Sequence, residues 1–419
     1  MPRLVAGKNK GAISSALVKE EGPVSYIEYN IDTDGKIVKG TTVINLTGVT
    51  DIGDYVFQDA YKGMSTISGI IDLSSLTTVS GQYAFSNAYY SCSNITGVDL
   101  SSLISITGSH AFYYSFSSNN RLSTIDFSSL TTIPGEWGLS WSFNDNNSLT
   151  SVSFPSLVLL SGYRALYFGF YRCYNLTEVN MPLLEKMTQT DALNGTFSNC
   201  SKLQRLILPK LIVVTGTGVM YVCVEKCTSL TSFELPSLVT ATNECLYSCC
   251  PNCTSLTKVD LSSLKSISSK TFYNCFNGCS SLAELKFPAL KTISYSNAFD
   301  TMLYNCSGIT VHFPSNLQSV IGSWSSVING FSGTNTTVLF DLPATIILTG
   351  NNTIEYERNP KEDTVTALAW RIKDTGTATD PIIDWTPYYT SGTIDPQVED
   401  NIYSDSACTT VVTTISTLV

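Results

Sequence analysis

The chain has 419 residues, of which 43% are hydrophobic and 14% charged, and its formal net charge is −10. It is too apolar and aromatic for a disordered chain and too long for one ordinary globular core, so we expect several units or a repeat array. The acidic balance repels nucleic acid and anionic membranes, which argues against both as partners.

The first 40 residues differ from those that follow. "SYIEYNIDTDGKIVKG" predicts two strands around an Asp-Gly turn, and we interpret residues 1–40 as an N-terminal β cap over the first repeat. This end reads as neither a secretory signal nor a membrane span, since no run of 18 apolar residues occurs. We therefore expect no membrane insertion.

From about residue 41 an apolar anchor residue recurs, in seven steps of 27 residues and then three of 26. Such a constant step predicts a solenoid in which each repeat forms one coil stacked on its neighbours. The anchors are Leu46, Leu73, Leu100, Phe127, Phe154, Met181, Leu208, Leu235, Leu261, Phe287 and Phe313.

Residues 111–130, "AFYYSFSSNNRLSTIDFSSL", illustrate one coil. Apolar and polar residues alternate before the anchor, which predicts a short strand, and a proline or serine after it ends that strand. Phe112, Phe116 and Asn119 are spaced four and three apart, like one face of a helical turn. We therefore predict an α/β solenoid with a parallel β-sheet on one face, short helices on the other and small β-rich terminal regions.

The combined pattern, AFxxxFxxCxSLxxxxLPSL, resembles the BspA-like type of bacterial leucine-rich repeat over about residues 41–325. The repeats here are a few residues longer than is usual in that family. The resemblance implies a curved solenoid and a surface-exposed, adhesin-like binding protein that is not an enzyme.

Beyond Trp324 the period fails, and "TTVLFDLPATIILT" (336–349) looks like a final strand. We assign residues 41–350 to the solenoid and 351–419 to a small β-rich C-terminal appendage. The tail "YYTSGTIDPQVEDNIYSDSACTTVV" is similar to terminal segments of bacteriophage tail and appendage proteins, which implies a place on a virion.

Thirteen cysteines cannot all pair within one chain. Most recur because the repeat recurs, and Asn119 and Asn146 take the same position in two coils, so a buried structural ladder is favoured. Zinc or disulfides at the three Cys-x-x-x-Cys pairs are the alternatives, with Cys249 and Cys253 in the densest cluster. We expect no metal and no cofactor. The shared position holds Cys92, Cys173, Cys200, Cys227, Cys253 and Cys279.

Catalysis has little support in the sequence. The two histidines, His110 and His312, lie in different coils, so no catalytic residues are assigned. Asp72, Asp99 and Asp126 recur before their anchors, where neighbouring carboxylates would raise one another's pKa or attract a cation. We favour a solvated acidic stripe, with a calcium- or sugar-binding stripe, or an enzyme acting on glycans, as alternatives.

Exposed rows on the strand face are the predicted binding surface, because a flat polar surface suits a protein or glycan better than a small molecule. The exposed tyrosines Tyr90, Tyr113, Tyr114 and Tyr171 on the helical side form a rival site, because aromatic faces stack on sugars; the alternative is that they merely cover the coil edges. The predicted binding residues are Asp72, Asp99, Thr124, Asp126, Ser151, Ser153, Glu178, Asn180, Arg205, Glu234, Lys258 and Asp260.

We therefore expect a non-enzymatic recognition or adhesion module that binds a host-surface protein or glycan. It would act extracellularly, on a bacterial cell surface or a virion, and could form a homo-oligomer. The alternative function is a structural spacer or assembly protein without a ligand of its own.

Overall fold

The structure is a computed structural model that describes residues 3–4, 46–314, 317 and 336–341, together with six strands between residues 345 and 418. Two compact units are present: Met1–Val311 with Ile321–Thr337, and His312–Val320 with Val338–Val419. The predicted N-terminal cap lies outside the described residues, except for β1 (Arg3–Leu4), which pairs in parallel with β2 (Asp51–Ile52). The domain boundaries given above stay predictions.

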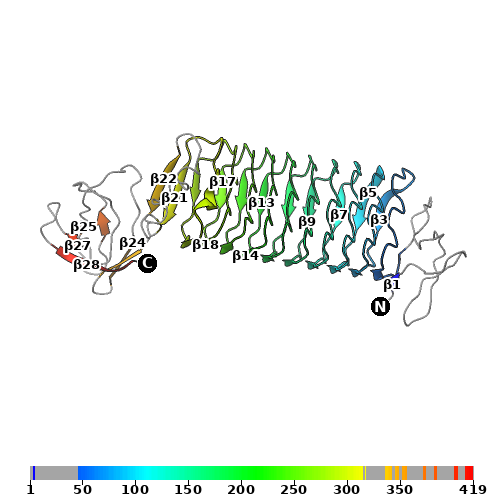
Figure 1. The fold of residues 1–419 in the computed structure, drawn as a ribbon, viewed down its shortest axis with the longest axis horizontal. Coiled ribbons are helices and arrows are strands. Elements are labelled where there is room, and N and C mark those ends of the chain that lie inside the picture. The colour runs from blue at the N-terminus through cyan, green and yellow to red at the C-terminus, as the bar shows by residue number, and fades with distance from the viewer. Residues whose placement is uncertain are drawn as a thin grey trace, which may run out of the picture. The chain divides into compact units, whose positions relative to one another are not determined.

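The first unit is a stack of similar coils, in which strands of successive coils lie side by side (Figure 1). Each coil contributes one strand to what we call the strand face. These strands are β3 (Ser68–Asp72), β5 (Asn94–Asp99), β7 (Thr124–Asp126), β9 (Ser151–Ser153), β11 (Glu178–Asn180), β13 (Arg205–Ile207), β15 (Ser232–Glu234), β17 (Lys258–Asp260), β19 (Glu284–Lys286) and β21 (Thr310–Pro314).

A second, two-residue strand follows in each coil and builds a continuous nine-stranded parallel sheet. Its residue pairs are 27 apart between early coils and 26 apart between late coils, as the anchor spacing predicts. The strands are β4 (Thr78–Val79), β6 (Ser105–Ile106), β8 (Thr132–Ile133), β10 (Leu159–Leu160), β12 (Lys186–Met187), β14 (Val213–Val214), β16 (Thr240–Ala241), β18 (Ser266–Ile267) and β20 (Thr292–Ile293).

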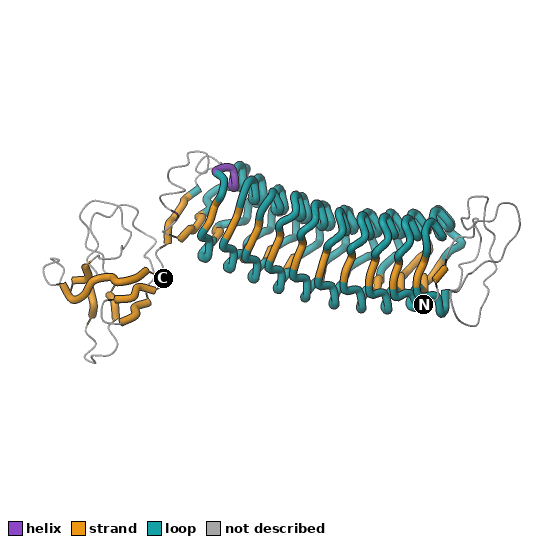
Figure 2. Tube along the Cα trace, turned by 60° about the horizontal axis from the view of Figure 1, so that its bottom comes forward, coloured by secondary structure: helices purple, strands orange, loops and turns teal. Residues whose placement is uncertain are grey.

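The short helices predicted on the other side are wrong. In their place each coil has a segment of successive turns, which we call the turn ribbon and which is drawn as loop in Figure 2. Within the described residues the one helix is a single 3₁₀ turn, η1 (Ser296–Phe299). The turn ribbon comprises residues 82–92, 109–119, 136–146, 163–173, 190–200, 217–227, 243–253 and 269–279.

The backbone of the turn ribbon explains why no helix forms. Every fourth residue is left-handed, as at His110, Tyr114 and Ser118, with φ between 55° and 60°. Alternate N–H groups then bond to the next coil, as from Phe112 to the Gly138 carbonyl at 2.9 Å. The others close turns inside the coil, as from Ser115 to the Phe112 carbonyl at 3.0 Å. The ribbon thus satisfies its backbone partly through its neighbours, which an α-helix does not do.

The core lies between the strand face, the two-residue strands and the turn ribbon. All eleven anchors are at most 3% exposed, which confirms the predicted column of buried residues. Aromatic rings from the ribbon stack behind them, such as Phe85 on Phe112 at 5.0 Å between centroids. Each fully buried Leu or Phe contributes about 1.5–3 kcal/mol, so the stack of coils supplies most of the stability.

One corner of the coil brings neighbouring backbones into direct contact. A Cβ atom added to Gly108 would lie 2.1 Å from the carbonyl oxygen of Gly81 in the preceding coil. Glycine is therefore required there, and this corner sets how closely the coils approach.

The second unit contains a six-stranded sheet in the order β24-β23-β28-β27-β25-β26. A further strand, β22 (Thr337–Asp341), precedes it. None of the described helices has the length and apolar character needed to cross a bilayer. The sheet strands are β23 (Thr345–Leu348), β24 (Asn352–Glu355), β25 (Arg371–Lys373), β26 (Ile382–Asp384), β27 (Asn401–Tyr403) and β28 (Val411–Leu418).

Candidate binding surface

The predicted binding residues all lie on strands of the strand face, and the parallel register aligns them across coils. Asp72 lies beside Asp99, and Asp99 beside Asp126. The remaining alignments are Thr124 with Gly97, Ser151 with Glu178, Ser153 with Asn180, Arg205 with Ser232, Ser232 with Lys258, and Glu234 with Asp260. These side chains are exposed or half-buried, as expected for an outward row.

The aligned aspartates have a local structural role. Asp99, Asp126 and Asp260 each accept a hydrogen bond from the backbone N–H of the serine two residues later, at 2.8–3.0 Å. Asp72 accepts from both the backbone and the hydroxyl of Ser74. Each aspartate therefore fixes the turn that follows its strand.

These hydrogen bonds also affect the pKa of Asp72, the first residue of the acidic stripe formed by Asp72, Asp99 and Asp126. Those from the Ser74 hydroxyl and N–H hold the pKa of Asp72 below its ordinary value, so the expectation of a raised pKa is wrong for this residue. Among the residues that the structure describes, no group of three or more His, Cys, Asp or Glu side chains could hold a metal ion. The solvated stripe is the interpretation that these contacts favour.

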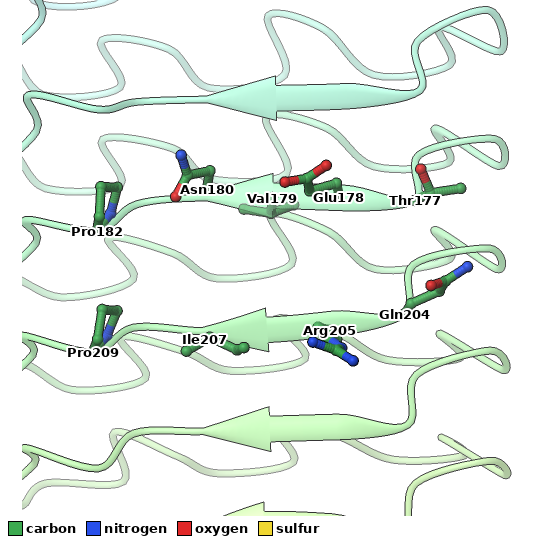
Figure 3. Close-up of a pocket in the computed structure, with 9 residues that line it drawn as sticks. All are labelled: Thr177, Glu178, Val179, Asn180, Pro182, Gln204, Arg205, Ile207 and Pro209. Carbon is green, nitrogen blue, oxygen red and sulfur yellow. The ribbon is translucent and has the colours of Figure 1, made fainter.

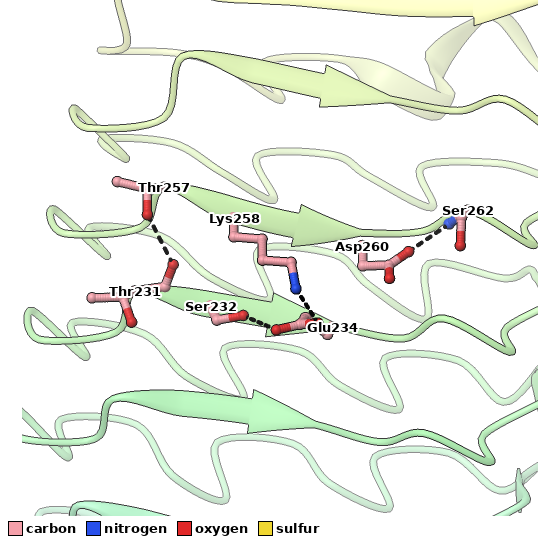
Figure 4. A network of polar contacts seen from close by, with 7 residues as sticks. All are labelled: Thr231, Ser232, Glu234, Thr257, Lys258, Asp260 and Ser262. Carbon is pink, nitrogen blue, oxygen red and sulfur yellow. Dashed lines mark hydrogen bonds and ion pairs between the residues drawn. The ribbon is translucent and has the colours of Figure 1, made fainter.

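A polar network joins the later coils of the strand face (Figure 4). Lys258 Nζ donates to Glu234 Oε2 at 2.6 Å, and the Ser232 hydroxyl donates to the other carboxylate oxygen. Burial alone would raise the pKa of Glu234, but these two hydrogen bonds outweigh it and lower the pKa. The charged side chains are thus held in place before any partner arrives.

The strand face opens between β11 and β13. Corresponding anchor N–H groups bond across other junctions, as from Phe154 to the Asn180 carbonyl at 2.8 Å and from Leu208 to the Glu234 carbonyl at 3.0 Å. No such bond joins Met181 to Ile207, both of which the structure describes, and β11 and β13 fall in separate sheets. The same is true of the described junctions between β7 and β9 and between β17 and β19.

A groove of about 540 Å³ lies at this opening (Figure 3). Glu178 and Asn180 line it from one coil, and Gln204 and Arg205 from the next. All four side chains are exposed. The groove therefore places three of the predicted residues around one hollow that the spacing of the sequence did not indicate.

The turn ribbon carries an aromatic surface that sequence reasoning found in part. Tyr90, Tyr113, Tyr114 and Tyr171 lie there and are half-buried rather than exposed, and the rival site stays a prediction. Sequence reasoning missed two columns of stacked rings. Successive rings of a column are 27 residues apart, a spacing that can be seen in the sequence. We call these and their neighbouring tyrosines the aromatic belt: Tyr83, His110 and Trp137; Tyr114, Trp141 and Phe168; and Tyr113, Tyr163, Tyr167 and Tyr171.

His110 belongs to this belt rather than to a catalytic group. Its ring stacks between Tyr83, at 4.6 Å, and Trp137, at 5.5 Å. The Ser109 hydroxyl lies 2.8 Å from Nδ1, and burial lowers the pKa of the imidazole. A ring covered on both faces has a packing role in the column.

The cysteine ladder is confirmed as a structural feature. The Cys173 thiol donates to the Phe143 carbonyl at 3.2 Å, and the Asn146 amide at the same position donates to the Phe116 carbonyl at 2.9 Å. Twelve of the cysteines lie in the described part of the chain, all buried and none in a disulfide. Zinc and disulfides, the alternatives, are not seen among these residues.

Comparison with protein-family models identifies the family to which these repeats belong. Overlapping matches to the BspA-type leucine-rich repeat region run from residue 41 to residue 353, with six copies of that region recognised. No curated protein matches the chain. The similarity of the C-terminal tail to bacteriophage proteins, which lies largely outside the described residues, receives no support from these comparisons.

The solved structures that match this chain have low sequence identity to it and low TM-scores. A leucine-rich repeat protein from Bacteroides ovatus is 17% identical, with 70% of this chain and 88% of that chain covered and a TM-score of 0.31. The structure of a TLR13–ssRNA13 complex is 12% identical, with 70% and 47% covered and a TM-score of 0.26. This chain therefore spans about half of the TLR13 chain.

Proposed function

Because the chain belongs to the BspA-type leucine-rich repeat family, we propose that it is a non-enzymatic recognition module that binds a protein partner through its strand face. The partner would be a host-surface protein, and the module would be displayed outside the cell, on a bacterial surface or a virion. The observation that carries this proposal is the groove between β11 and β13, with exposed side chains of both charges around it.

The shape of the strand face supports a macromolecular partner. A typical protein interface uses about 800 Å² and 20–30 residues on each side. Three-residue strands from successive coils provide an outward surface of that order, whereas a small ligand needs an enclosed apolar pocket. The groove would take a protruding side chain of the partner near the centre of such an interface.

The side chains also suit a protein. Arginine is enriched among residues that dominate protein interfaces, and Arg205 lies across the groove from Glu178. The Lys258–Glu234 contact is held in advance by hydrogen bonds, so less side-chain freedom is lost on binding. Together these features favour a partner surface with complementary charges of both signs.

Binding of the fluorescently labelled full chain to intact bacterial and animal cells, with and without prior protease treatment of the cells, tests the proposal. We expect at least one cell type to bind the chain and to lose that binding after protease treatment. The double variant Glu178→Ala/Arg205→Ala should bind about tenfold more weakly, equivalent to about 1.4 kcal/mol.

A matched control is Glu185→Ala/Lys186→Ala, which removes one negative and one positive charge from the coil that carries Glu178 but outside the strand face. It should bind as the wild type does. Binding that survives protease treatment, or that falls equally in both variants, would contradict the proposal. No binding to any surface combined with self-association in light scattering would favour the spacer.

A further inference from the structure

We propose a second binding site on the other side of the coil: a cluster of the aromatic belt around Arg164 that binds a neutral glycan chain. It is separate from the strand face and takes a different class of ligand. Its residues are Trp137, Trp141, Tyr163, Arg164, Tyr167 and Tyr171, from two neighbouring coils.

The first observation is the backbone on which these side chains stand. Trp137 and Trp141 have φ of 55°, and Arg164 and Phe168 have φ of 51–52°. A left-handed conformation costs an L-residue about 1–2 kcal/mol. Later coils have residues that adopt this conformation more easily at the corresponding positions, including Gly195 and Gly218. The early coils thus carry bulky rings where the fold itself favours small residues.

The rings are not needed to fill the core. Leu139, Phe143, Leu166 and Phe170 of the same coils occupy the interior and are fully buried. Trp137 and Trp141 lie outside them and stay half-exposed. Stacking along the columns, such as Trp141 on Phe168 at 4.6 Å, offsets part of the backbone cost.

Arg164 gives the cluster its polar centre. Its guanidinium carbon lies 4.6 Å from the ring of Trp137, 4.9 Å from that of Tyr163 and 4.8 Å from that of Tyr167. Nε donates to Asp191 Oδ2 at 2.9 Å, which fixes the guanidinium and balances its charge. Among the described residues the Nη groups have no hydrogen-bond partner, and the Arg164 side chain is 28% exposed, so their N–H donors are available to a ligand.

Two tyrosine hydroxyls extend this pattern. Those of Tyr163 and Tyr167 have no hydrogen-bond partner in the part of the chain that the structure describes, and both side chains are half-exposed. Tyr167 is inclined by 65° to the ring of Trp137 and by 68° to that of Trp141. Its ring therefore crosses the stacked column instead of continuing it, and the group that lies over its face is the Arg164 guanidinium.

This combination of groups matches a sugar chain. A sugar ring has an apolar face that packs on an aromatic ring and hydroxyls at its edge that accept from arginine N–H groups and exchange hydrogen bonds with tyrosine. Tyr114 and Phe168 cover the two faces of Trp141, so the tyrosine rings are the ones on which the sugar would pack. Because Asp191 balances Arg164 and the net charge is −10, a polyanionic glycan would be disfavoured.

Isothermal titration of the full chain with fragments of neutral polysaccharides, namely β-glucan, xylan, mannan and chitin, tests the proposal, with polyuronates in a parallel arm. We expect at least one neutral fragment to bind. Tyr167→Phe, which removes one hydroxyl, should weaken binding about fivefold. Trp137→Gly, which suits the backbone angle, should weaken it more than tenfold while cooperative unfolding is retained.

The matched control is Tyr247→Phe, at the corresponding position three coils later, where the ring stacks on Tyr273 at 4.7 Å away from any arginine contact. It should leave glycan binding unchanged, as should Glu178→Ala/Arg205→Ala. Absence of binding to every neutral fragment, binding of polyuronates alone, or equal effects of the two tyrosine variants would overturn the proposal. Because the strand-face variants are scored separately, failure of one site is distinguishable from failure of the other.

Discussion

At the scale of single residues, the recurring cysteine acts as a hydrogen-bond donor inside the core. Burial raises the pKa of Cys173 to about 12, so the thiol stays protonated at neutral pH and can donate to a carbonyl of the preceding coil. Cys200 makes the same contact with the Phe170 carbonyl at 3.2 Å. The position therefore needs a small buried donor, which explains why asparagine replaces cysteine in two coils.

We predict that Cys200→Ala lowers the free energy of unfolding by about 1–3 kcal/mol, because the Phe170 carbonyl would lose a partner inside the core. Cys200→Ser keeps a donor and should cost less. Urea denaturation followed by circular dichroism measures both, with the exposed Tyr174→Ala as the control. Equal losses for the alanine and serine variants would show that volume, not the hydrogen bond, decides stability at this position.

The sequence was sufficient to predict that the recurring cysteines form a buried structural ladder. Asn119 and Asn146 stand in register with the cysteines, and that exchange argues for a shared structural role rather than for metal binding. What could not be predicted is the acceptor. It lies about 30 residues earlier, on a ribbon whose backbone conformation the sequence pattern did not reveal.

At the scale of elements, the turn ribbon shows how a helical spacing can mislead. Phe112, Phe116 and Asn119 do point into the core, but spacings of four and three also fit turns that repeat every four residues. The distinguishing signal is the set of left-handed positions, where Asp191, Asn199 and Gly218 occur in later coils. It emerges only when coils are aligned with one another, because the early coils carry aromatic residues there.

A glycine in this element gives a sharp test. Gly195 has φ of 63°, and a Cβ added there would lie 2.5 Å from the ring of Phe168. We predict that Gly195→Ala costs about 2–3 kcal/mol, from the backbone strain and the ring contact together. Gly63→Ala, at φ of 75° with open space around it, should cost about 1 kcal/mol.

Thermal and urea denaturation of these two variants and of Phe168→Ala/Gly195→Ala separates the contributions. In the double variant the glycine substitution should add no more than it costs at Gly63, because the clashing ring is gone. A loss from Gly195→Ala that is unchanged when Phe168 is removed would mean that the ring does not press on this position.

At the scale of the whole molecule, the architecture follows from the constancy of the repeat. The steps of 27 and 26 residues predicted the coils, their parallel pairing and the buried anchors, because like residues in register must superimpose. The groove between β11 and β13 was not predictable in this way. It is lined by side chains of two particular coils, among them Glu178 and Arg205, and a repeat pattern treats all junctions alike.

Removal of one complete coil tests the stacked-coil architecture. We predict that deletion of residues 209–235, which joins Leu208 to Pro236, leaves a cooperatively folded solenoid, because the same ladders re-form between the remaining coils. The urea m-value should fall by roughly a tenth, in proportion to the surface that unfolding exposes. Deletion of residues 209–221, about half a coil, should abolish folding, since it breaks every register. Similar folding of both deletions would contradict the stacked-coil arrangement.

The direction of the bonds between coils has a mechanical consequence. In the strand face, the two-residue strands and the turn ribbon alike, they run from one coil to the next, along the stacking direction of the solenoid. Tension applied between the ends would load one junction at a time and peel off single coils, each releasing roughly 90 Å of chain at about 3.4 Å per residue. A solenoid of this design therefore lengthens in small steps under a sudden pull instead of unfolding all at once.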